Sequence, residues 1–212
     1  MGMLNRIVEL LVDKKIFVRQ RTNHETKVIA LLVYHAGLSY RKTSEIIGNL
    51  EPFSYEALRK WYKKCIAFFK PQKKQRLVIA VDETKVKWEG RQIYIWNAID
   101  IEDHVVLAVY VSVSRTSFDA VYFLKLVLNT CENKPFILVD GGPWYRWAFQ
   151  RLGLEWEHQT FGERNHIEQW YTQYKARVKR FWKRFPYHSS LQSICQWSVS
   201  WTGLYNLLLE VS

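Results

Sequence analysis

The chain has 212 residues, of which 48% are hydrophobic and 16% aromatic, and its formal net charge at pH 7 is +11. This length and apolar content exclude an intrinsically disordered protein and allow one sizeable core with a small additional domain. Residues 1–76 carry 16 Lys and Arg against 6 Asp and Glu, residues 77–160 carry 8 against 11, and residues 161–212 carry 7 against 3. An acidic centre between basic flanks suits a protein that holds metal ions and grips a polyanion, although charge alone also fits a soluble basic protein.

The three cysteines, Cys65, Cys131 and Cys195, are far apart in the sequence and form no C-x-x-C pair. They predict buried thiols in a reducing compartment rather than disulfides or a zinc site. Polar and charged side chains interrupt the start of the chain, which is unlike a signal peptide. The longest apolar run nearby, residues 28–34, is too short to span a bilayer. We therefore expect a cytoplasmic protein without a membrane partner.

Three helices are predicted before residue 70. An apolar stripe over residues 28–36 ends at Gly37, and Ser39 caps a second helix over residues 40–47. Ser54 caps a third helix that carries many cations. Two short helices joined by a tight turn, the second of them basic, are typical of a helix-turn-helix.

The third helix is the candidate DNA-recognition helix, because the N-terminal part of the last helix of this motif enters the major groove. The candidate DNA contacts on it are Ser54, Tyr55, Arg59, Lys60 and Lys63. The alternative is a three-helix bundle whose Lys and Arg side chains only face solvent. Helix pattern, turn spacing and charge agree, and this agreement favours DNA binding.

The pattern changes after residues 70–76, a stretch with a proline, four cationic residues and no apolar side chain that predicts a linker. Five strands are predicted beyond it, over residues 77–81, 92–99, 105–111, 136–139 and 154–158. Helices are predicted over residues 117–129, 143–152 and 167–185. This order is typical of an α/β domain with a mixed five-stranded sheet flanked by helices. We expect a helical domain over residues 1–70, with the helix-turn-helix at about 24–65, a linker over 71–76, a core over 77–186, and a C-terminal helix over 187–212 that packs on the core.

Three acidic residues stand where metal-dependent phosphodiester chemistry would need them. Asp82 follows the first strand, Asp140 follows the fourth strand, and Glu168 lies near the start of the last helix of the core. Carboxylates at strand ends and on a helix can together hold a pair of hard cations. Taken singly, each acid is more often a turn former or a solvated strand end, but their joint order favours a catalytic set.

Four local motifs carry a resemblance to a known family. They are Val-Asp-Glu-Thr-Lys at 81–85, Asn-Ala-Ile-Asp at 97–100, Asp-Gly-Gly-Pro-Trp-Tyr at 140–145 and Asn-His-Ile-Glu-Gln at 165–169. The order of strands and acids resembles the RNase H-like core of DDE transposases and retroviral-type integrases, and the motifs resemble the IS6 family of insertion-sequence transposases in the form seen in archaea. Residues 24–61 resemble that family's helix-turn-helix, and the whole resemblance covers roughly residues 24–186.

The resemblance implies a metal-binding triad of Asp82, Asp140 and Glu168. It would hold two Mg²⁺ ions, for which Mn²⁺ is expected to substitute. Other candidates for the third acid are Glu155, Glu157 and Glu163. Glu168 is favoured because related enzymes have a basic residue two helical turns after the catalytic Glu, where this chain has Lys175. Lys175 and Lys179 are the candidate phosphate contacts on this helix.

The resemblance also implies an activity and its partners. A transposase of this kind binds the terminal inverted repeats of its insertion sequence, cleaves DNA strands and joins them to target DNA, and pairing two DNA ends needs a homodimer or a larger assembly. Two other functions stay open on the residues alone. One is an RNase H-like structure-specific nuclease, and the other is a DNA-binding remnant or regulator without catalysis.

Overall fold

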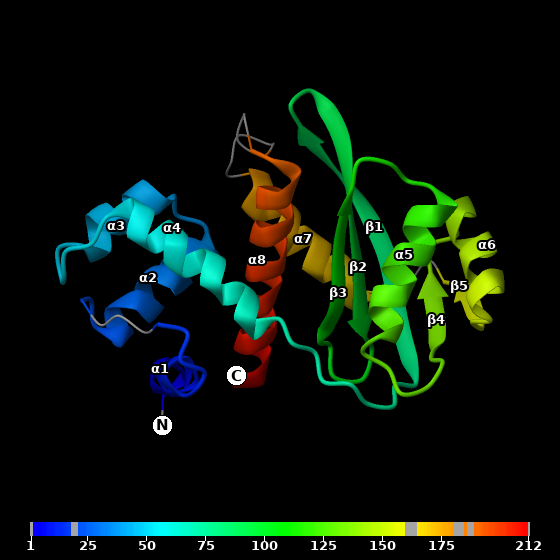
Figure 1. The fold of residues 1–212 in the computed structure, drawn as a ribbon, viewed down its shortest axis with the longest axis horizontal. Coiled ribbons are helices and arrows are strands. Elements are labelled where there is room, and N and C mark those ends of the chain that lie inside the picture. The colour runs from blue at the N-terminus through cyan, green and yellow to red at the C-terminus, as the bar shows by residue number, and fades with distance from the viewer. Residues whose placement is uncertain (1, 18–20, 160–164, 180–184, 186–188, 212) are drawn as a thin grey trace. The chain divides into compact units, whose positions relative to one another are not determined.

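The computed structural model describes residues 2–17, 21–159, 165–179, 185 and 189–211 (Figure 1). The chain divides into two compact units. One comprises Met1–Lys70 together with Gln196–Ser212, and the other comprises Pro71–Cys195. We refer to them as the helical unit and the sheet unit.

Helices alone build the helical unit. Its elements are α1 (Met3–Asp13), α2 (His24–Ala36), α3 (Tyr40–Ile47), α4 (Tyr55–Lys64), the short 3₁₀ helix η1 (Cys65–Phe68) and the part of α8 (Leu191–Val211) from Gln196 onwards. Stacked and edge-on tyrosines join three of these helices: the Tyr34 ring of α2 lies 3.8 Å from the Tyr40 ring of α3 and 4.5 Å from the Tyr62 ring of α4. Helices α2, α3 and α4 are those predicted from the sequence.

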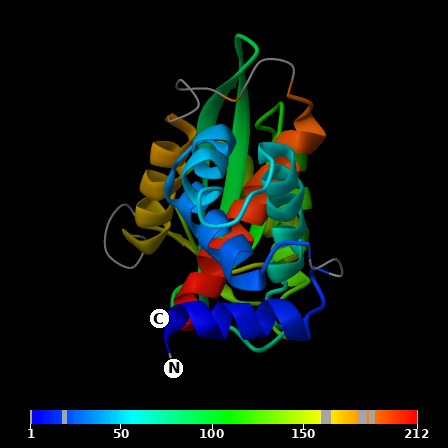
Figure 2. The ribbon, with the colours of Figure 1, turned by 90° about the vertical axis from the view of Figure 1, so that its left-hand side faces the viewer.

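The end of α8 belongs to the helical unit, which differs from the expectation that residues 187–212 pack on the core. The indole of Trp197 donates a hydrogen bond to the Tyr34 hydroxyl at 3.0 Å. The guanidinium of Arg6 donates to the carbonyl of Val211 at 3.0 Å, and Figure 2 shows α1 beside that end of α8. Gly203 permits close approach, because a Cβ there would lie 2.8 Å from the carbonyl oxygen of Cys65. These partners are far away in the sequence, so the apolar pattern of α8 gave no sign of them.

The sheet unit contains the mixed five-stranded sheet that was predicted. Its strands are β1 (Val78–Trp88), β2 (Arg91–Asp100), β3 (Val106–Ser112), β4 (Phe136–Val139) and β5 (Trp156–His158). Their order is β3-β2-β1-β4-β5. β1 to β3 pair antiparallel, whereas β4 pairs parallel with β1 and β5 parallel with β4. This is the arrangement of the RNase H-like fold.

β1 is longer than predicted and extends past Asp82 to Trp88. Beyond Asp82, buried Thr84 and Val86 alternate with exposed Lys85 and Lys87, which is the pattern of a strand with one covered face. This part of β1 pairs with β2 as a long hairpin. Asp82 therefore lies within a strand and not at its end.

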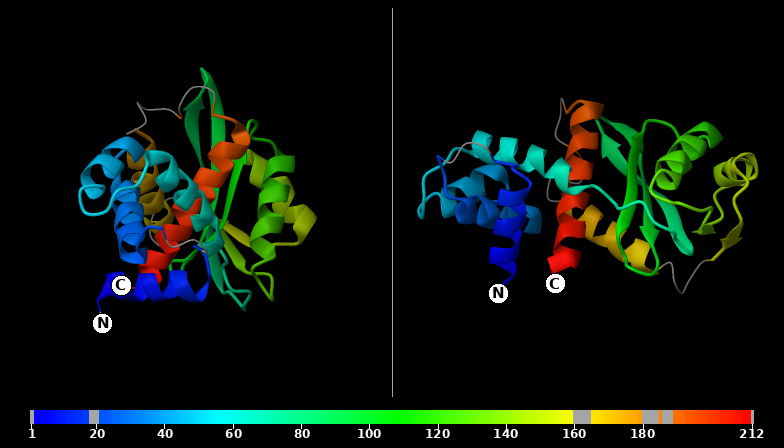
Figure 3. Two further views of the ribbon diagram at one scale, coloured as in Figure 1. Left: turned by 60° about the vertical axis from the view of Figure 1, so that its left-hand side comes forward. Right: turned by 60° about the horizontal axis from the view of Figure 1, so that its bottom comes forward.

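Helices cover both faces of the sheet (Figure 3). They are α5 (Ser117–Leu128) and α6 (Pro143–Leu152) on one face and α7 (Asn165–Lys179) on the other. Ile79 and Val81 of β1 pack in the core cluster with residues of α5 and α6, such as Phe123 and Phe149. Because side chains alternate along a strand, Asp82 belongs to the α7 face of the sheet. Residues 180–184, at the end of the predicted last helix of the core, lie outside the described residues.

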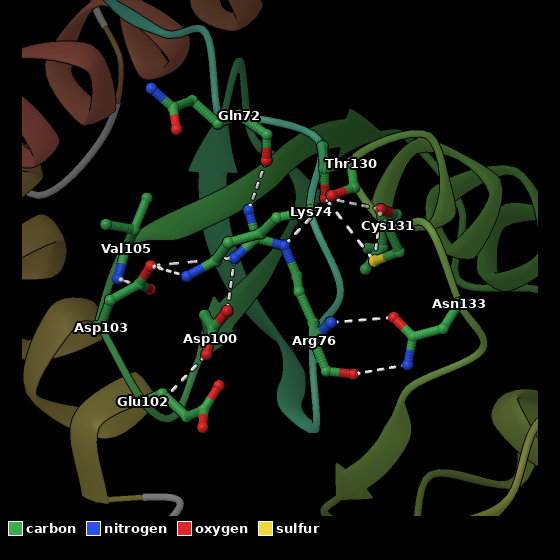
Figure 4. A network of polar contacts seen from close by, with 11 residues as sticks. Gln72, Lys74, Arg76, Asp100, Glu102, Asp103, Val105, Thr130, Cys131 and Asn133 are labelled. Carbon is green, nitrogen blue, oxygen red and sulfur yellow. Dashed lines mark hydrogen bonds and ion pairs between the residues drawn. The ribbon is translucent and has the colours of Figure 1, made fainter.

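A buried ion pair ties the segment before β1 to the end of β2 (Figure 4). The guanidinium of Arg76 donates to the carboxylate of Asp100, and neither side chain is more than 2% exposed. Arg76 also donates to the carbonyl oxygens of Thr130 at 3.1 Å and Gln72 at 2.7 Å. Its backbone exchanges two hydrogen bonds of 2.8 Å with the side chain of Asn133. Arg76, which the sequence placed in a solvated linker, is thus part of the interior.

The cysteine and membrane expectations can be compared with the described part of the chain. Cys65, Cys131 and Cys195 are free thiols; the first two are buried and Cys195 is half-buried. None of the described helices has the length and apolar character that a membrane crossing requires.

Candidate active site

The parallel pairing of β1 and β4 places two of the three predicted acids at matching positions of the chain. The last paired residues of these strands are Val81 and Val139. Asp82 follows Val81 within β1, and Asp140 follows Val139, the last residue of β4. Because neighbouring strands lie about 4.8 Å apart, the two acids follow paired residues of adjacent strands. Asp82 is half-buried and Asp140 is exposed.

The turn after Asp140 opens a pocket at the same edge of the sheet. Its volume is about 500 Å³, and its lining includes Asp140, Arg146 and His158. The Asp140 carboxylate lies 3.7 Å from Nε2 of His158 at the end of β5. Gly141 has a positive φ of 55°, and a Cβ there would lie 2.9 Å from the His158 ring. Both the backbone conformation and the close approach favour glycine at this position.

Helix α7 is fixed to β1 at the level of Asp82. The Tyr171 hydroxyl lies 2.6 Å from the carbonyl oxygen of Asp82 and 3.1 Å from that of Ile95. Glu168 is exposed in the first turn of α7, three residues before Tyr171. The third predicted acid is therefore one helical turn away from a residue that contacts Asp82.

A stacked pair of histidines holds the beginning of α7. The His166 ring lies 3.7 Å from the His104 ring, with an angle of 24° between them. Burial, and then the neighbouring His104, lower the pKa of His166. His166 thus packs against His104 from the first turn of α7, the turn that carries Glu168.

The described residues include no group of three His, Cys, Asp or Glu side chains already positioned to hold a metal ion. The donor chemistry of Asp82 and Asp140 nevertheless fits Mg²⁺, because this ion binds through one or two carboxylates and keeps waters or substrate phosphates as its other ligands. Glu168 is exposed in the first turn of α7. The alternatives Glu155 and Glu157 are exposed at β5, and Glu163 lies outside the described residues.

Glu83, the neighbour of Asp82, is the strongly perturbed acid of this region. Its side chain is 6% exposed, and it accepts hydrogen bonds from Arg115 at 3.2 Å and from the Trp144 indole at 3.3 Å. Burial, and then the negative charge of Asp82, raise the pKa of Glu83 to about 7, while Arg115 opposes this rise. The Arg115 guanidinium lies 3.8 Å from the centroid of the Trp144 ring. These contacts give Glu83 partners of its own on the side of the sheet that α5 and α6 cover.

The predicted DNA contacts on α4 differ in how accessible they are. Arg59, Lys60 and Lys63 are exposed. The hydroxyl of Ser54 caps α4 by accepting a hydrogen bond from Ala57 at 3.1 Å. Tyr55 is half-buried.

The Arg41 guanidinium lies 5.0 Å from the centroid of the Tyr55 ring. Arg41 is an exposed cation of α3 at the start of α4, and sequence reasoning did not include it among the candidate DNA contacts. Its contact with Tyr55 depends on how α3 and α4 pack, which the sequence pattern alone does not give.

The two predicted phosphate contacts on α7, Lys175 and Lys179, are also exposed. The Lys175 ammonium lies 5.7 Å from the centroid of the Tyr171 ring. Because α7 runs from Asn165 to Lys179 without a break, both lysines lie on the same helix as Glu168.

Comparisons with known proteins agree with this geometry. The family model of the DDE domain of IS240-type transposases matches residues 77–201, which is more than half of the chain. An uncharacterised protein of Methanocaldococcus jannaschii is 42% identical over 201 residues, which cover 94% of each chain. The transposase for insertion sequence element IS257 in transposon Tn4003 of Staphylococcus aureus is 25% identical over 134 residues, which cover 60% of this chain and 59% of that protein.

Among solved structures, the catalytic core domain of HTLV-2 integrase in complex with magnesium (trimeric form) aligns at 15% identity and a TM-score of 0.46, over 60% of this chain and 84% of that chain. The simian T-cell lymphotropic virus intasome aligns at 15% identity and a TM-score of 0.48, over 82% of this chain and 67% of that chain. The family match spans the five strands and the residues Asp82, Asp140 and Glu168. The chain belongs to the DDE transposases of the IS6 type.

Proposed function

We propose that this protein is a transposase that binds the terminal inverted repeats of its own insertion sequence, cleaves the DNA strand at each end and joins it to target DNA. The observation that carries this proposal is the position of Asp82 and Asp140 on neighbouring parallel strands, directly after the last pair, Val81 and Val139. Membership of the DDE family supports the reaction class, and the exposed cations of α4 support the choice of DNA as substrate.

The three acids would hold two Mg²⁺ ions, or Mn²⁺ in their place. When bound, this metal pair would lower the pKa of an attacking hydroxyl and stabilise the charge on the attacking and leaving oxygens. Asp82, Asp140 and Glu168 would supply the carboxylate oxygens that hold these ions. Carboxylates used in this way supply charge and geometry and do not attack the DNA themselves, so no covalent protein–DNA bond is expected.

Two groups of cations would hold the DNA. Arg59, Lys60 and Lys63 of α4 would contact the terminal repeat, with Ser54 and Tyr55 at the start of the same helix. Lys175 and Lys179 of α7 would contact phosphates close to the reacting bond. Because two DNA ends must be joined to one target, we propose that the active form is a homodimer or a larger assembly on DNA.

A strand-transfer assay tests the proposal. The substrate is a labelled duplex that ends in a terminal repeat of the insertion sequence, incubated with a supercoiled target plasmid and Mg²⁺ or Mn²⁺. The wild-type protein should give joined products. Asp82→Asn, Asp140→Asn and Glu168→Gln should each reduce joining by at least about a hundredfold, because each removes a charge that stabilises the transition state. Glu132→Gln, at an exposed acid of the sheet unit with no proposed role in the reaction, is the matched control and should retain activity.

The same assay separates the alternative functions. Release of nicked repeat ends without joined products would indicate a structure-specific nuclease, in which water is the only attacking group. Specific binding of the repeat by the wild type and all variants, without cleavage under either metal, would indicate a DNA-binding regulator and would refute the transposase proposal.

A further inference from the structure

The side chain of Asn97 on β2 is buried without a hydrogen-bond partner. Its exposed fraction is 0%, and neither its Nδ2 nor its Oδ1 has a partner among the described residues. A carboxamide carries two donor hydrogens and an acceptor oxygen, and leaving them unpaired in the interior destabilises the folded protein. A buried amide in this state therefore needs a role that outweighs its cost.

The position of Asn97 in the sheet indicates what that role is. Asn97 pairs directly with Asp82 across the antiparallel β1–β2 ladder. Residues opposite one another in such a ladder point to the same face, and their Cβ atoms are roughly 5 Å apart. The carboxamide of Asn97 and the carboxylate of Asp82 thus leave neighbouring strands side by side on the α7 face.

On its other side Asn97 pairs with Val109 of β3, an apolar residue that is 7% exposed. The Tyr171 hydroxyl of α7 is engaged with the carbonyl oxygens of Asp82 and Ile95. Of the residues paired with Asn97 in the sheet, only Asp82 has a side chain that can accept a hydrogen bond from it.

We propose that Asn97 is a positioning residue for the metal ligand Asp82. In the metal-loaded protein, Nδ2 of Asn97 donates a hydrogen bond to one carboxylate oxygen of Asp82 and fixes the direction in which the other lone pairs point. This inference rests on the proposed function, because it assumes that Asp82 holds a cation. The backbone amide of Glu83 already donates to Oδ1 of Asp82 at 2.7 Å, and an ionised carboxylate can accept further bonds.

The chemistry of the carboxamide suits this task. Lysine or arginine in the place of Asn97 would neutralise Asp82 and compete with the cation, and a second carboxylate would repel Asp82. A neutral donor orients the carboxylate and leaves its negative charge for the metal. Partners behind the ligands commonly tune metal affinity in this way, and their loss costs about 10–100-fold in affinity.

The test compares Mn²⁺ affinity with stability in a variant of the full chain. Asn97→Leu has nearly the shape of asparagine but no hydrogen-bond donor. Titration of Mn²⁺, followed by calorimetry or by the electron paramagnetic resonance signal of the free ion, should show about tenfold weaker binding to Asn97→Leu. The midpoint of thermal unfolding without metal should rise for Asn97→Leu, because an unpaired buried amide has been replaced by an apolar group.

Val109→Ala is the matched control. It leaves a small cavity beside Asn97, so its unfolding midpoint should fall while its Mn²⁺ affinity stays within about twofold of the wild type. Unchanged Mn²⁺ affinity of Asn97→Leu, or a lowered midpoint, would make Asn97 an ordinary structural residue and overturn the inference.

Asp82→Asn distinguishes this failure from failure of the proposed function. If Asp82→Asn loses Mn²⁺ and Asn97→Leu does not, only the role of Asn97 is refuted. If the wild type binds no Mn²⁺, or Asp82→Asn binds it as the wild type does, the metal site itself is refuted, and the role of Asn97 with it.

Discussion

Asp82 and Glu83 are adjacent in β1 but face opposite sides of the sheet, and this alternation gives two carboxylates different environments. Asp82 is half-buried and belongs to the α7 face, next to Asn97. Glu83 is buried among Arg115 and Trp144 beside the α5 and α6 layer. A group with a pKa of about 7 next to a candidate metal ligand is easily mistaken for a ligand itself in a search based on perturbed acids. The contacts of Glu83 instead connect β1 to the beginning of α6.

The raised pKa of Glu83 predicts that the free energy of unfolding falls as the pH rises. Its pKa rises from 4.5 in the unfolded chain to about 7 in the folded protein, so the folded state binds more protons between these values. Stability is therefore lost as the pH rises through this window, by about 1.4 kcal/mol per pKa unit before other effects. Glu83→Gln should stabilise the metal-free protein by roughly 2 kcal/mol at pH 8 and have little effect at pH 4, as measured by urea unfolding at both values.

The exposed Glu132 gives the control for this measurement, because Glu132→Gln removes a carboxylate of the sheet unit that is not buried. The gain from Glu83→Gln at pH 8 should exceed that from Glu132→Gln. An equal gain at pH 4 and pH 8 would mean that Glu83 keeps an ordinary pKa.

At the scale of elements, side-chain contacts fix the segment before β1 to the rest of the sheet unit. Lys74 forms an ion pair with Asp103 at 2.7 Å, and Arg76 reaches the buried Asp100 (Figure 4). This joins residues 72–76 to the β2–β3 turn and to the end of α5. A substitution in residues 72–76 is therefore expected to change the stability of the sheet unit.

Arg76→Met should destabilise the sheet unit by about 3–5 kcal/mol, because it leaves the Asp100 carboxylate buried without its partner. The double variant Arg76→Met with Asp100→Leu should recover most of this loss, since it removes both charges together. Urea unfolding of the single and double variants checks this. A loss below about 1 kcal/mol in the single variant would show that water compensates Asp100.

Sequence periodicity predicted most of these elements, and its failures have specific causes. The five strands and α5, α6 and α7 were recognised because their apolar residues repeat with the period of a strand or a helix. Arg76 was assigned to a linker because its partner Asp100 lies 24 positions later and burial by an ion pair leaves no periodic signal. Asp82 was placed at a strand end because its polar side chain interrupts the apolar run, although the alternation resumes at Thr84. The adjacency of Asp82 and Asp140 was expected from motif order, whereas the unpaired state of Asn97 could be seen only in three dimensions.

At the scale of the whole molecule, the helical unit is assembled from the two ends of the chain. Trp197 bonds to Tyr34, and Gly203 lets α8 approach η1 closely. The helices that carry the candidate DNA contacts therefore depend on residues that follow the entire sheet unit in the sequence. The predicted helix-turn-helix, α2 to α4, therefore shares its compact unit with the last helix of the chain.

Removal of residues 196–212 should abolish binding to terminal repeats, although α3 and α4 remain in the chain. The expected cause is loss of packing around Tyr34 and η1, visible as reduced helical circular dichroism and an earlier unfolding transition. Fluorescence anisotropy with a labelled repeat measures the binding. Leu209→Ala, at a 40% exposed position of the same helix, is the control and should bind normally. Full affinity of the shortened chain would show that the α2 to α4 segment folds without α8.

The position of residues 196–211 also has a consequence for synthesis on the ribosome. Domains generally form as their residues emerge, beginning at the N-terminus. Here α2, α3 and α4 emerge first, but their packing surface for α8 stays open until the five strands and the acids at positions 82, 140 and 168 have been made. An interrupted nascent chain would thus lack a finished helical unit. If this unit binds the terminal repeats as proposed, incomplete polypeptides would not occupy them, and only molecules that already carry the acidic residues would bind the ends.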